Sequence, residues 1–547
     1  MMGFSQHLLI LPILLPMAAG AILLLFEERR HSLKAGINIA ATALLLGLAF
    51  ALLRLADTGD AAGGAVTHTY RLGDWAPPFG IVLVLDRLSA LMLVLASVLA
   101  AATLVFSLAR WHKAGPHFHT LFQFLLMGVN GAFLTGDLFN LFVFFEVLLA
   151  ASYGLMLHGS GAFRVRAGLH YIAINLAASL LFLIGVSLIY GVTGTLNMAD
   201  LAMRIPEVAP ENQALLAAGA AVLGIAFLVK AGMWPLCFWL PSAYMAASAP
   251  ASALFAILSK VGFYVLLRLT LLLFGADAGP LAGFGSQVLL IGGMATIAFG
   301  AFGVLASQSL GRLAGYSILV SSGTLLAAVG LGDQAVVSGA MFYVVSSTIT
   351  VSALFLIIEL VERAQEPAAN LLTVTMEAYG DDIEPEEEDE EEVGVVMPGA
   401  LAILGVCFGC LGLLLAGLPP LSGFIGKFAL INAIFNPQGL GTAAGGPDSI
   451  GWILTALLIL SGLAALLAMM RTGIRTFWAP LEVIVPRVLV VEIVPIILLI
   501  GLCFLLTVQA GAVMRYTDAA AQALHEPRSY IEGVLPGSES ASGVSTQ

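Results

Sequence analysis

The sequence predicts an all-α, polytopic membrane protein with about fourteen transmembrane helices. Hydrophobic residues make up 60% of the chain and charged residues only 10%, whereas soluble globular proteins average about 25% charged residues. The chain has 547 residues, and a soluble domain stops enlarging a single core at roughly 250–300 residues. So few charges cannot solvate the surface of so long a chain, and lipid is therefore the expected solvent.

Apolar segments of about 20 residues, the length that spans a bilayer, recur along the whole chain. No Lys or Arg precedes the first segment, and the charged run 27–30 follows it. Because a cleaved signal peptide carries its positive charge in front, we expect a retained helix with an external N-terminus. The predicted spans are 8–26, 36–56, 80–108, 118–135, 138–158, 168–192, 214–236, 243–274, 285–307, 312–332, 336–362, 398–434, 452–470 and 488–514.

The polar segments between these spans indicate the orientation of the chain. Lys and Arg are more numerous in the loops that an external N-terminus makes cytoplasmic, as the positive-inside rule requires. Both termini are therefore predicted to be external. The tail after Tyr516 is polar and is expected to be disordered. Because the chain has no basic patch to hold phosphates, no nucleic acid partner is expected.

An acidic run at 381–392 lies inside a polar loop at 365–396. Like charges of this density repel one another and stay solvated, which predicts a disordered insert. The functional alternative is a docking segment or a local attractor for protons or cations.

Three of the five lysines lie deep inside apolar segments and are the main candidates for chemistry. A charged side chain at the bilayer centre costs at least ~2.5–3.5 kcal/mol, and Lys230 and Lys260 are too far from segment ends for snorkelling to explain them. Glu146 is the matching acid in the middle of its segment. Burial disfavours a charged lysine and a nearby carboxylate favours it, so a Glu–Lys pair whose separation changes can take up and release a proton. The alternative is an inert buried ion pair.

Prolines predict a helix break beside two of these lysines. A proline in a helix interior removes a backbone donor and kinks the helix, and transporters form midplane sites at interrupted helices. Two such segments in separate halves of the chain suggest an internal repeat. The predicted breaks lie at Pro235 and Pro241, after Lys230, and at Pro419 and Pro420, before Lys427.

No metal site and no cofactor are expected. Cys407 and Cys410 form a C-x-x-C pair, but zinc and iron–sulfur sites need further Cys or His ligands, and none stands nearby in the sequence. His112, His117 and His119 flank a predicted loop and are expected to be solvated or interfacial.

Taken together, these motifs resemble the antiporter-like subunits. That family includes the large pumping subunits of respiratory complex I and of the multisubunit Mrp (also called Mnh or Pha) cation/proton antiporters. Within the family, the run 136–154 is most similar to the D subunit of the Mrp-type antiporter. The motifs that carry the resemblance are Leu85–Ala90, the helix with Phe145 and Glu146, Lys230 with Trp234–Pro235 and Phe238–Pro241, Ser259–Gly262, and Leu418–Pro420 with Gly426–Phe428.

The resemblance implies two inverted five-helix repeats, each with one broken helix. Three N-terminal helices would occupy 1–117, the first repeat 118–274, the second repeat 285–471, and a C-terminal helix with a polar tail 472–547. By position in the family motifs, the proton-translocating residues would be Glu146, Lys230, Lys260 and Lys427.

The resemblance also implies a function. The chain would be a secondary transporter subunit rather than an enzyme, coupling proton movement to Na⁺ or K⁺ export in a bacterial inner membrane. Its partners would be the lipid bilayer and the other membrane subunits of the antiporter. The alternative is a membrane-arm subunit of a complex I-like NADH:quinone oxidoreductase or related hydrogenase complex. Intramembrane lysines argue against a third possibility, a purely structural scaffold.

This sequence departs from the family pattern at two places. Many relatives carry His and Lys on the eleventh helix, where this chain has the hydroxyl-rich stretch 343–352, and relatives often have His where this chain has Cys237. The link between Lys260 and Lys427 would then depend on hydroxyls and water. The candidate relay side chains are Ser346, Ser347, Thr348, Tyr316 and Ser317, with Ser321 and Ser322 beside them.

Overall fold

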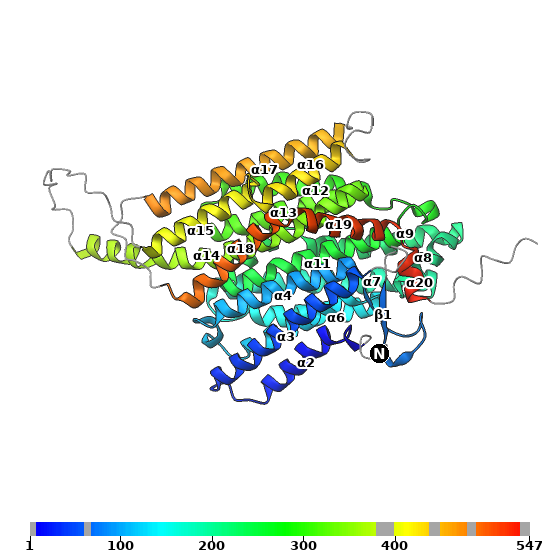
Figure 1. The fold of residues 1–547 in the computed structure, drawn as a ribbon, viewed down its shortest axis with the longest axis horizontal. Coiled ribbons are helices and arrows are strands. Elements are labelled where there is room, and N and C mark those ends of the chain that lie inside the picture. Colours follow the sequence, from blue (N-terminus) through cyan, green and yellow to red (C-terminus); the bar gives the residue numbers. More distant parts are fainter. Residues whose placement is uncertain (1–6, 59–66, 379–398, 437–448, 479–487, 536–547) are drawn as a thin grey trace, which may run out of the picture.

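The computed structural model is a bundle of long helices (Figure 1). It describes residues 7–58, 67–378, 399–436, 449–478 and 488–535. For residues 364–378 it describes only the helical backbone. The acidic run 381–392 and the last residues of the tail lie outside the described residues. The helices are α2 (Leu11–Leu24), α3 (His31–Asp57), α4 (Arg87–Ser107), α5 (Phe118–Leu134), α6 (Leu138–Leu157), α7 (Ala162–Thr193), α8 (Met198–Arg204), α9 (Pro210–Ala231), α10 (Trp239–Ala246), α11 (Ala249–Leu273), α12 (Ser286–Ala306), α13 (Leu310–Leu331), α14 (Gln334–Ala378), α15 (Gly399–Ala416), α16 (Ser422–Phe435), α17 (Ser449–Gly473), α18 (Val490–Val508), α19 (Ala510–His525) and α20 (Arg528–Val534).

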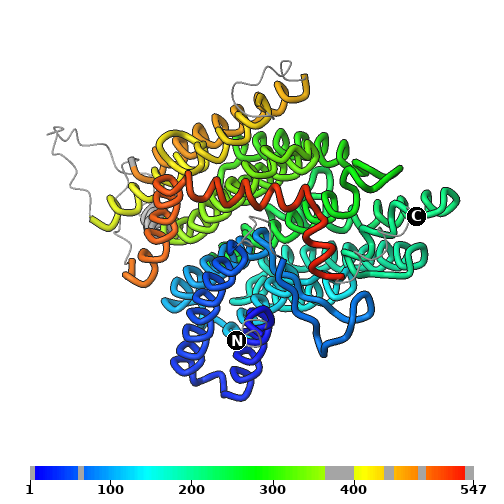
Figure 2. The backbone as a smooth tube through the Cα atoms, turned by 45° about the vertical axis from the view of Figure 1, so that its right-hand side comes forward, coloured from blue at the N-terminus to red at the C-terminus, as the bar shows by residue number. Residues whose placement is uncertain are grey.

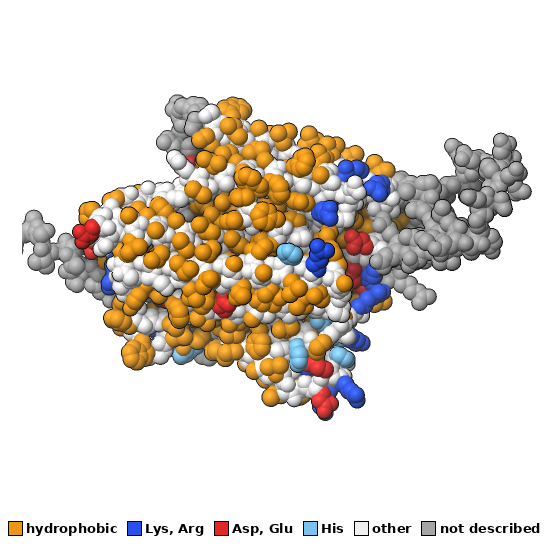
Figure 3. Space-filling model, turned by 180° about the vertical axis from the view of Figure 1, so that it is seen from behind, with side chains coloured by type: hydrophobic (Ala, Val, Ile, Leu, Met, Phe, Trp, Pro, Cys, Tyr) orange, Lys and Arg blue, Asp and Glu red, His pale blue; other side chains and the backbone are white. Residues whose placement is uncertain are grey.

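The prediction of an all-α, polytopic membrane protein is confirmed. Within the described residues, twelve helices are long and apolar enough to cross a membrane, and α2, α5 and α16 are shorter apolar helices. Each of the fourteen predicted segments contains a helix. Hydrophobic side chains cover most of the face shown in Figure 3. Phe302 on α12 is 73% exposed and Ile459 on α17 is 60% exposed, as expected for helices that face lipid.

Two helices form the centre of the bundle. Nearly every side chain of α11 is buried, and so are the side chains of α14 from Val336 to Ile358 apart from Ser347. These helices pack against each other and against α13. Lys260 and the hydroxyl-rich stretch of α14 therefore lie inside the protein, shielded from lipid.

The third predicted segment, 80–108, is not helical throughout. Its first residues form strand β2 (Val82–Leu85), which pairs antiparallel with β1 (His68–Arg71) in the register His68 to Leu85. The helix α4 starts only at Arg87, because Asp86 and Ser89 form a capping box in which each side chain accepts a hydrogen bond from the other's backbone N–H at 2.9 Å. Such a box satisfies donors that the first turn of a helix leaves free.

A buried ion pair joins α4 to α11. The Arg268 guanidinium donates to both carboxylate oxygens of Asp86, at 2.7 and 2.9 Å, and it lies over the ring of Tyr530 from α20. Burial raises the pKa of the Asp86 carboxyl, but the charge of Arg268 and the hydrogen bonds from Arg268 and Ser89 outweigh burial, so that the pKa lies below its ordinary value. Arg268, which lies near the external end of a predicted span, is thus a buried residue of α11 and not a charge of an external loop.

The prediction of a disordered tail after Tyr516 is wrong for residues up to 535. Helices α19 and α20 run across the surface of the bundle, where they are coloured red in Figure 2. Ala520, Ala521 and Leu524 are buried beneath α19, and Ser338 of α14 is hydrogen-bonded to Thr517 at 3.0 Å and to Asp518 at 2.5 Å. The apolar stripe of α19 covers only one face of the helix, so the sequence does not resemble a membrane span. Such a stripe is enough to hold an amphipathic helix against other helices.

Candidate functional site

The first candidate lysine lies in the last turn of α9. Lys230 is only 8% exposed, and its ammonium group donates to the Oδ1 atom of Asn175 on α7 at 2.9 Å. The helix ends two residues later at Gly232, whose φ of +74° is the left-handed conformation that favours glycine at a helix C-terminus. The chain therefore leaves the helix just after the lysine, within the protein interior.

The carboxylate of Glu146 does not form an ion pair with Lys230 in the described structure. Its neighbour on α6, Phe145, places its ring 5.9 Å from the Lys230 ammonium, so that the two helices meet at this point. The Oε1 atom of Glu146 is buried and has no hydrogen-bond partner in the described part of the chain. A buried polar atom without a partner is rare and costly, and among the residues with such an atom Glu146 is the one on α6 that can carry a negative charge.

The prolines after Lys230 lie in different settings. Pro235 is in the non-helical link between α9 and α10, and Pro241 is in the first turn of α10, where a proline is tolerated because its N–H would be unpaired. The link is anchored by the backbone N–H of Trp234, which donates to the Thr296 hydroxyl at 2.8 Å.

The second lysine is at the centre of the bundle. Lys260 on α11 is 2% exposed, and its ammonium donates to the hydroxyls of Ser321 at 2.9 Å and Ser322 at 3.4 Å on α13. The Ser321 hydroxyl is hydrogen-bonded in turn to Ser347 on α14 at 3.0 Å. The structure thus connects Lys260 to two further helices through hydroxyl groups.

The segments that carry Lys230 and Lys260 are packed closely together. A Cβ atom added at Gly262 would lie 2.9 Å from the backbone nitrogen of Ala231, so the two backbones touch beside the lysines. No hydrogen bond within the described residues joins the two ammonium groups.

The third lysine lies at the second interrupted helix. Lys427 on α16 donates to the backbone oxygens of Ala416 at 3.0 Å and Leu415 at 3.4 Å, which are among the carbonyls that the end of α15 leaves without an intrahelical partner. Helix α15 ends at Gly417, with φ +76°, and a Cβ atom there would lie 2.6 Å from Cδ of Lys427. Pro419 and Pro420 follow in the link to α16.

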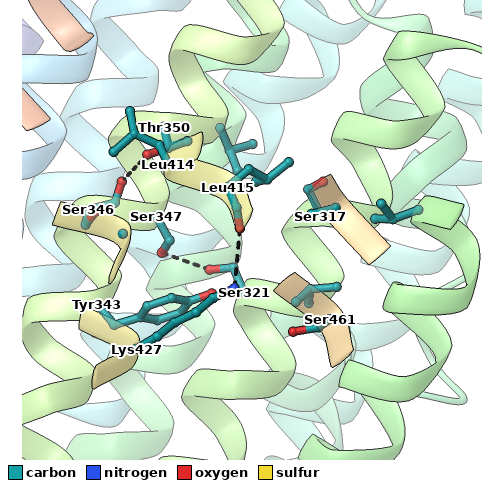
Figure 4. Close-up of a pocket in the computed structure, with 15 residues that line it drawn as sticks. Ser317, Ser321, Tyr343, Ser346, Ser347, Thr350, Leu414, Leu415, Lys427 and Ser461 are labelled. Carbon is teal, nitrogen blue, oxygen red and sulfur yellow. Dashed lines mark hydrogen bonds between the residues drawn. The ribbon is translucent and has the colours of Figure 1, made fainter. Parts of the chain in front are cut away.

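A cavity lined by hydroxyl groups extends from Ser321, the partner of Lys260, to Lys427 (Figure 4). Its volume, measured for the centres of water molecules, is about 30 Å³, and a cavity needs only about 10–15 Å³ on that measure to hold one water. The cavity therefore has room for ordered water between the two lysines. Its polar lining consists of Ser317, Ser321, Tyr343, Ser346, Ser347, Thr350, Lys427 and Ser461.

The predicted relay side chains divide into two groups. Ser317, Ser346 and Ser347 line the cavity, and Ser346 is also hydrogen-bonded to Ser422 at the start of α16 at 2.8 Å. Tyr316 packs its ring against Phe299, with centroids 6.0 Å apart, and Thr348 donates to a carbonyl of its own helix; neither lines the cavity.

Three residues of the site, Asn175, Ser422 and Ser461, were not singled out from the sequence. Asn175 is an amide inside an apolar segment, and Ser461 is a hydroxyl inside another. An isolated amide within a membrane span is itself a signal that could have identified Asn175 as the partner of a buried charge. Serine carries no such signal, because it packs readily between membrane helices.

The expectation that the histidines beside the loop are solvated or interfacial is wrong for two of them. His112 and His119 are buried, and the His119 ring is hydrogen-bonded to Asn38 of α3 at 2.8 Å. Within the described part of the chain, no group of three or more His, Cys, Asp or Glu residues is arranged to hold a metal ion.

Comparison with protein families gives a match over more than half of the chain. The family described as "NADH:quinone oxidoreductase/Mrp antiporter, TM" matches residues 135–444, which include all four predicted proton-translocating residues.

The chain is also similar to curated proteins over nearly its whole length. It is 60% identical over 539 residues to the D subunit of a "Probable K(+)/H(+) antiporter" from Rhizobium meliloti (strain 1021), covering 98% of both chains. It is 35% identical over 536 residues to the D subunit of the "Na(+)/H(+) antiporter" of Alkalihalophilus pseudofirmus, covering 97% of this chain and 99% of the relative.

Solved structures share the fold. A chain of the Mrp complex from Dietzia sp. DQ12-45-1b superposes with a TM-score of 0.80 at 25% identity, covering 97% of this chain and 100% of that chain. A chain of respiratory complex I from Thermus thermophilus superposes with a TM-score of 0.72 at 22% identity, covering 97% of this chain and 100% of that chain. The arrangement of helices is therefore common to antiporter and respiratory complexes, whereas the higher sequence identities are to antiporter subunits.

Proposed function

The chain belongs to the family of D subunits of Mrp-type cation/proton antiporters, and on that premise we propose that it is a proton-translocating membrane subunit of a multisubunit antiporter. It is a multi-pass membrane protein, which we place in the bacterial inner membrane with both termini external. The complex exchanges H⁺ for K⁺ or Na⁺, and its other membrane subunits are the partners of this chain. As a transporter subunit, the chain is not itself an enzyme.

The row of buried lysines supports this function most strongly. Lys260 is connected through Ser321 and Ser347 to a cavity with room for water that reaches Lys427. Three buried lysines without carboxylate partners in the described structure destabilise a membrane protein, so a structural role explains them poorly. Hydroxyl groups and ordered water are the groups that pass protons between such sites, because each is both a donor and an acceptor.

We propose that Glu146 and Lys230 form the entry to this path. Glu146 has an unpaired buried oxygen and Lys230 is held by an amide, Asn175, within the described residues. A movement that brings the carboxylate to the ammonium favours the charged lysine, and a movement that separates them favours proton release. The proton then has Lys260, the hydroxyl cavity and Lys427 as successive sites.

The two interrupted helices support the proposed repeat of 118–274 and 285–471. In each, a helix ends at a glycine with positive φ, Gly232 or Gly417, and a proline-containing link follows. Each break lies beside one of the buried lysines, as in transporters whose midplane sites form at broken helices.

The response of proton transport to each cation is the most direct test of this function. We expect K⁺ to be the transported ion, because the relative with 60% identity is named for K⁺. In inside-out vesicles that carry the whole complex and are energised by a separate proton pump, added K⁺ should collapse the pH gradient more strongly than Na⁺. A stronger response to Na⁺ would reassign the cation. Acidification driven by an electron donor, with no response to either cation, would contradict the antiporter function.

The hydroxyl path predicts a defect in a variant that keeps all lysines. The double substitution Ser321→Ala and Ser347→Ala removes the hydrogen bonds between Lys260 and the cavity. A hydrogen bond to a charged group is worth about 1.5–3 kcal/mol, so the rate of cation-driven proton movement should fall about tenfold or more. Ser259→Ala is the matched control, since Ser259 is a buried serine of α11 that bonds only to its own helix in the described structure. An equal rate in the double variant and the control would exclude these hydroxyls from the path.

A further inference from the structure

Two adjoining cavities lie at the end of the bundle where α11 ends, outside the proposed proton path. They share the residues Thr270, Leu273 and Phe274. The first, which we call the apolar groove, has a volume of about 280 Å³, and the second, the polar end pocket, about 320 Å³. The groove is lined almost wholly by apolar side chains of α9, α11 and α12, including Leu216, Ala220, Leu228, Leu266, Leu269 and Val288.

The apolar groove is open to the lipid-facing surface and has the length of one leaflet. Ile225 and Val288 on its rim are 41% and 56% exposed. Along α9 the groove extends from Leu216 to Leu228, which corresponds to about 18 Å at 1.5 Å per residue. Half of a hydrocarbon core of about 30 Å is about 15 Å. The groove therefore matches the depth to which one acyl chain enters the membrane.

The polar end pocket carries one acid and one base without partners. Asp277, in the turn after α11, and Arg528, at the start of α20, both line it and are exposed. Neither side chain has a hydrogen bond or an ion pair with any residue that the structure describes. The third titratable group, His525, has both ring nitrogens within hydrogen-bond distance of backbone oxygens, those of Ala521 at 2.8 Å and Gly332 at 2.7 Å. A pocket with one unpaired carboxylate and one unpaired guanidinium is complementary to a zwitterion.

We propose that the two cavities together bind one phospholipid with an amine headgroup. An acyl chain occupies the apolar groove, the phosphate binds Arg528, because guanidinium groups recognise phosphate oxygens, and the ammonium binds Asp277. The site holds the C-terminal helices to the end of α11 through the lipid. This inference does not depend on the proposed transport function, since none of the proton-path residues lines either cavity.

A variant that fills the groove tests the acyl-chain site. Gly224 lines the groove, and a Cβ atom added there meets nothing within 4 Å, so the side chain of Gly224→Leu starts from an unhindered position and is expected to occupy part of the groove. Gly191→Leu on α7 is the matched control, since Gly191 likewise has no neighbour within 4 Å of its Cβ position and does not line the groove. The whole complex, delipidated in detergent and incubated with phosphatidylethanolamine, should retain one phospholipid fewer in the Gly224→Leu form by native mass spectrometry. Equal lipid counts in wild type, Gly224→Leu and Gly191→Leu would overturn the proposal.

Variants at the mouth test the headgroup. Wild type is expected to retain phosphatidylethanolamine in preference to phosphatidylglycerol, and Asp277→Ala should bring the ratio of the two close to one. Arg528→Ala should lower retention of both lipids, whereas Glu211→Ala, an exposed acid outside the pocket, should change neither. Unchanged selectivity in Asp277→Ala would overturn the assignment of the ammonium site. Efficient cross-linking of Val288→Cys to another subunit of the complex would show that a protein helix, and not a lipid, occupies the groove.

Discussion

Replacing Lys230 with alanine is expected to abolish cation-dependent proton transport while the complex still assembles. The substitution removes the amino group that Asn175 holds and that lies beside the helix bearing Glu146, so no amine remains to take up and release a proton at the entry of the path. It also relieves the cost of a buried charge, which is why assembly should persist. The measurement is the collapse of the pH gradient in inside-out vesicles after adding K⁺ or Na⁺, with the amount of co-purifying subunits as the measure of assembly.

Lys113→Ala serves as the matched control for this experiment. Lys113 is an exposed lysine that lies outside the membrane-spanning helices, so its loss should leave transport unchanged. Glu146→Gln should reproduce the defect of Lys230→Ala, because glutamine keeps the shape of glutamate but takes no charge. Wild-type transport by a fully assembled Lys230→Ala complex would rule out the lysine path.

Replacing Arg268 with methionine is expected to cause the largest loss of stability. Methionine keeps the apolar stem of the side chain but leaves the Asp86 carboxylate buried without its partner, and the loss of one member of a buried pair costs about 3–5 kcal/mol. The pair connects α4, α11 and, through the ring of Tyr530, α20. The variant complex should show a lower thermal unfolding temperature in detergent and a smaller folded yield.

A second variant separates the charge effect from simple loss of packing. The double substitution Asp86→Asn and Arg268→Met removes both charges, so it should be more stable than Arg268→Met alone. Arg54→Met, at an exposed arginine with no side-chain partner in the described structure, should leave the unfolding temperature unchanged. If Arg268→Met were as stable as this control, the ion pair would not contribute to the fold.

The same pair predicts a pH dependence of stability. The pKa of Asp86 is lower in the folded protein than in the unfolded chain, so the unfolded state binds more protons as the pH falls. The stabilisation is therefore present above the unfolded-state pKa and is lost as the pH falls through the folded-state pKa. Wild type should lose more stability on acidification than the double variant, and parallel pH profiles would contradict this linkage.

The sequence by itself determined the solvent of this protein and the lysines that lie deep inside its apolar segments. Long apolar segments can satisfy their backbone only as helices in lipid, so composition and segment length sufficed to predict the membrane fold. Lys230, Lys260 and Lys427 stand out because so few charges occur in those segments. The positions of the helix breaks also followed from local chemistry, since glycine and proline act through their own backbone geometry.

Only the tertiary structure decided which polar groups these lysines contact. Lys230 bonds to Asn175, which is 55 residues away in sequence, and Lys260 bonds to Ser321, which is 61 residues away. Serines occur throughout the membrane helices, so their presence alone does not identify the path. The packing of α11, α13, α14 and α16 determines that Ser321 and Ser347 face the cavity. Thr348, the residue after Ser347, does not face it. Tertiary structure also decided the fate of α19. Its apolar stripe is narrow, so the helix is stable only where it packs against the bundle. Local sequence determines which segments lie in the membrane, because the cost of burying each side chain in lipid depends on its own polarity. The partners of each side chain depend instead on how distant helices rotate and pack against one another, which no local pattern encodes.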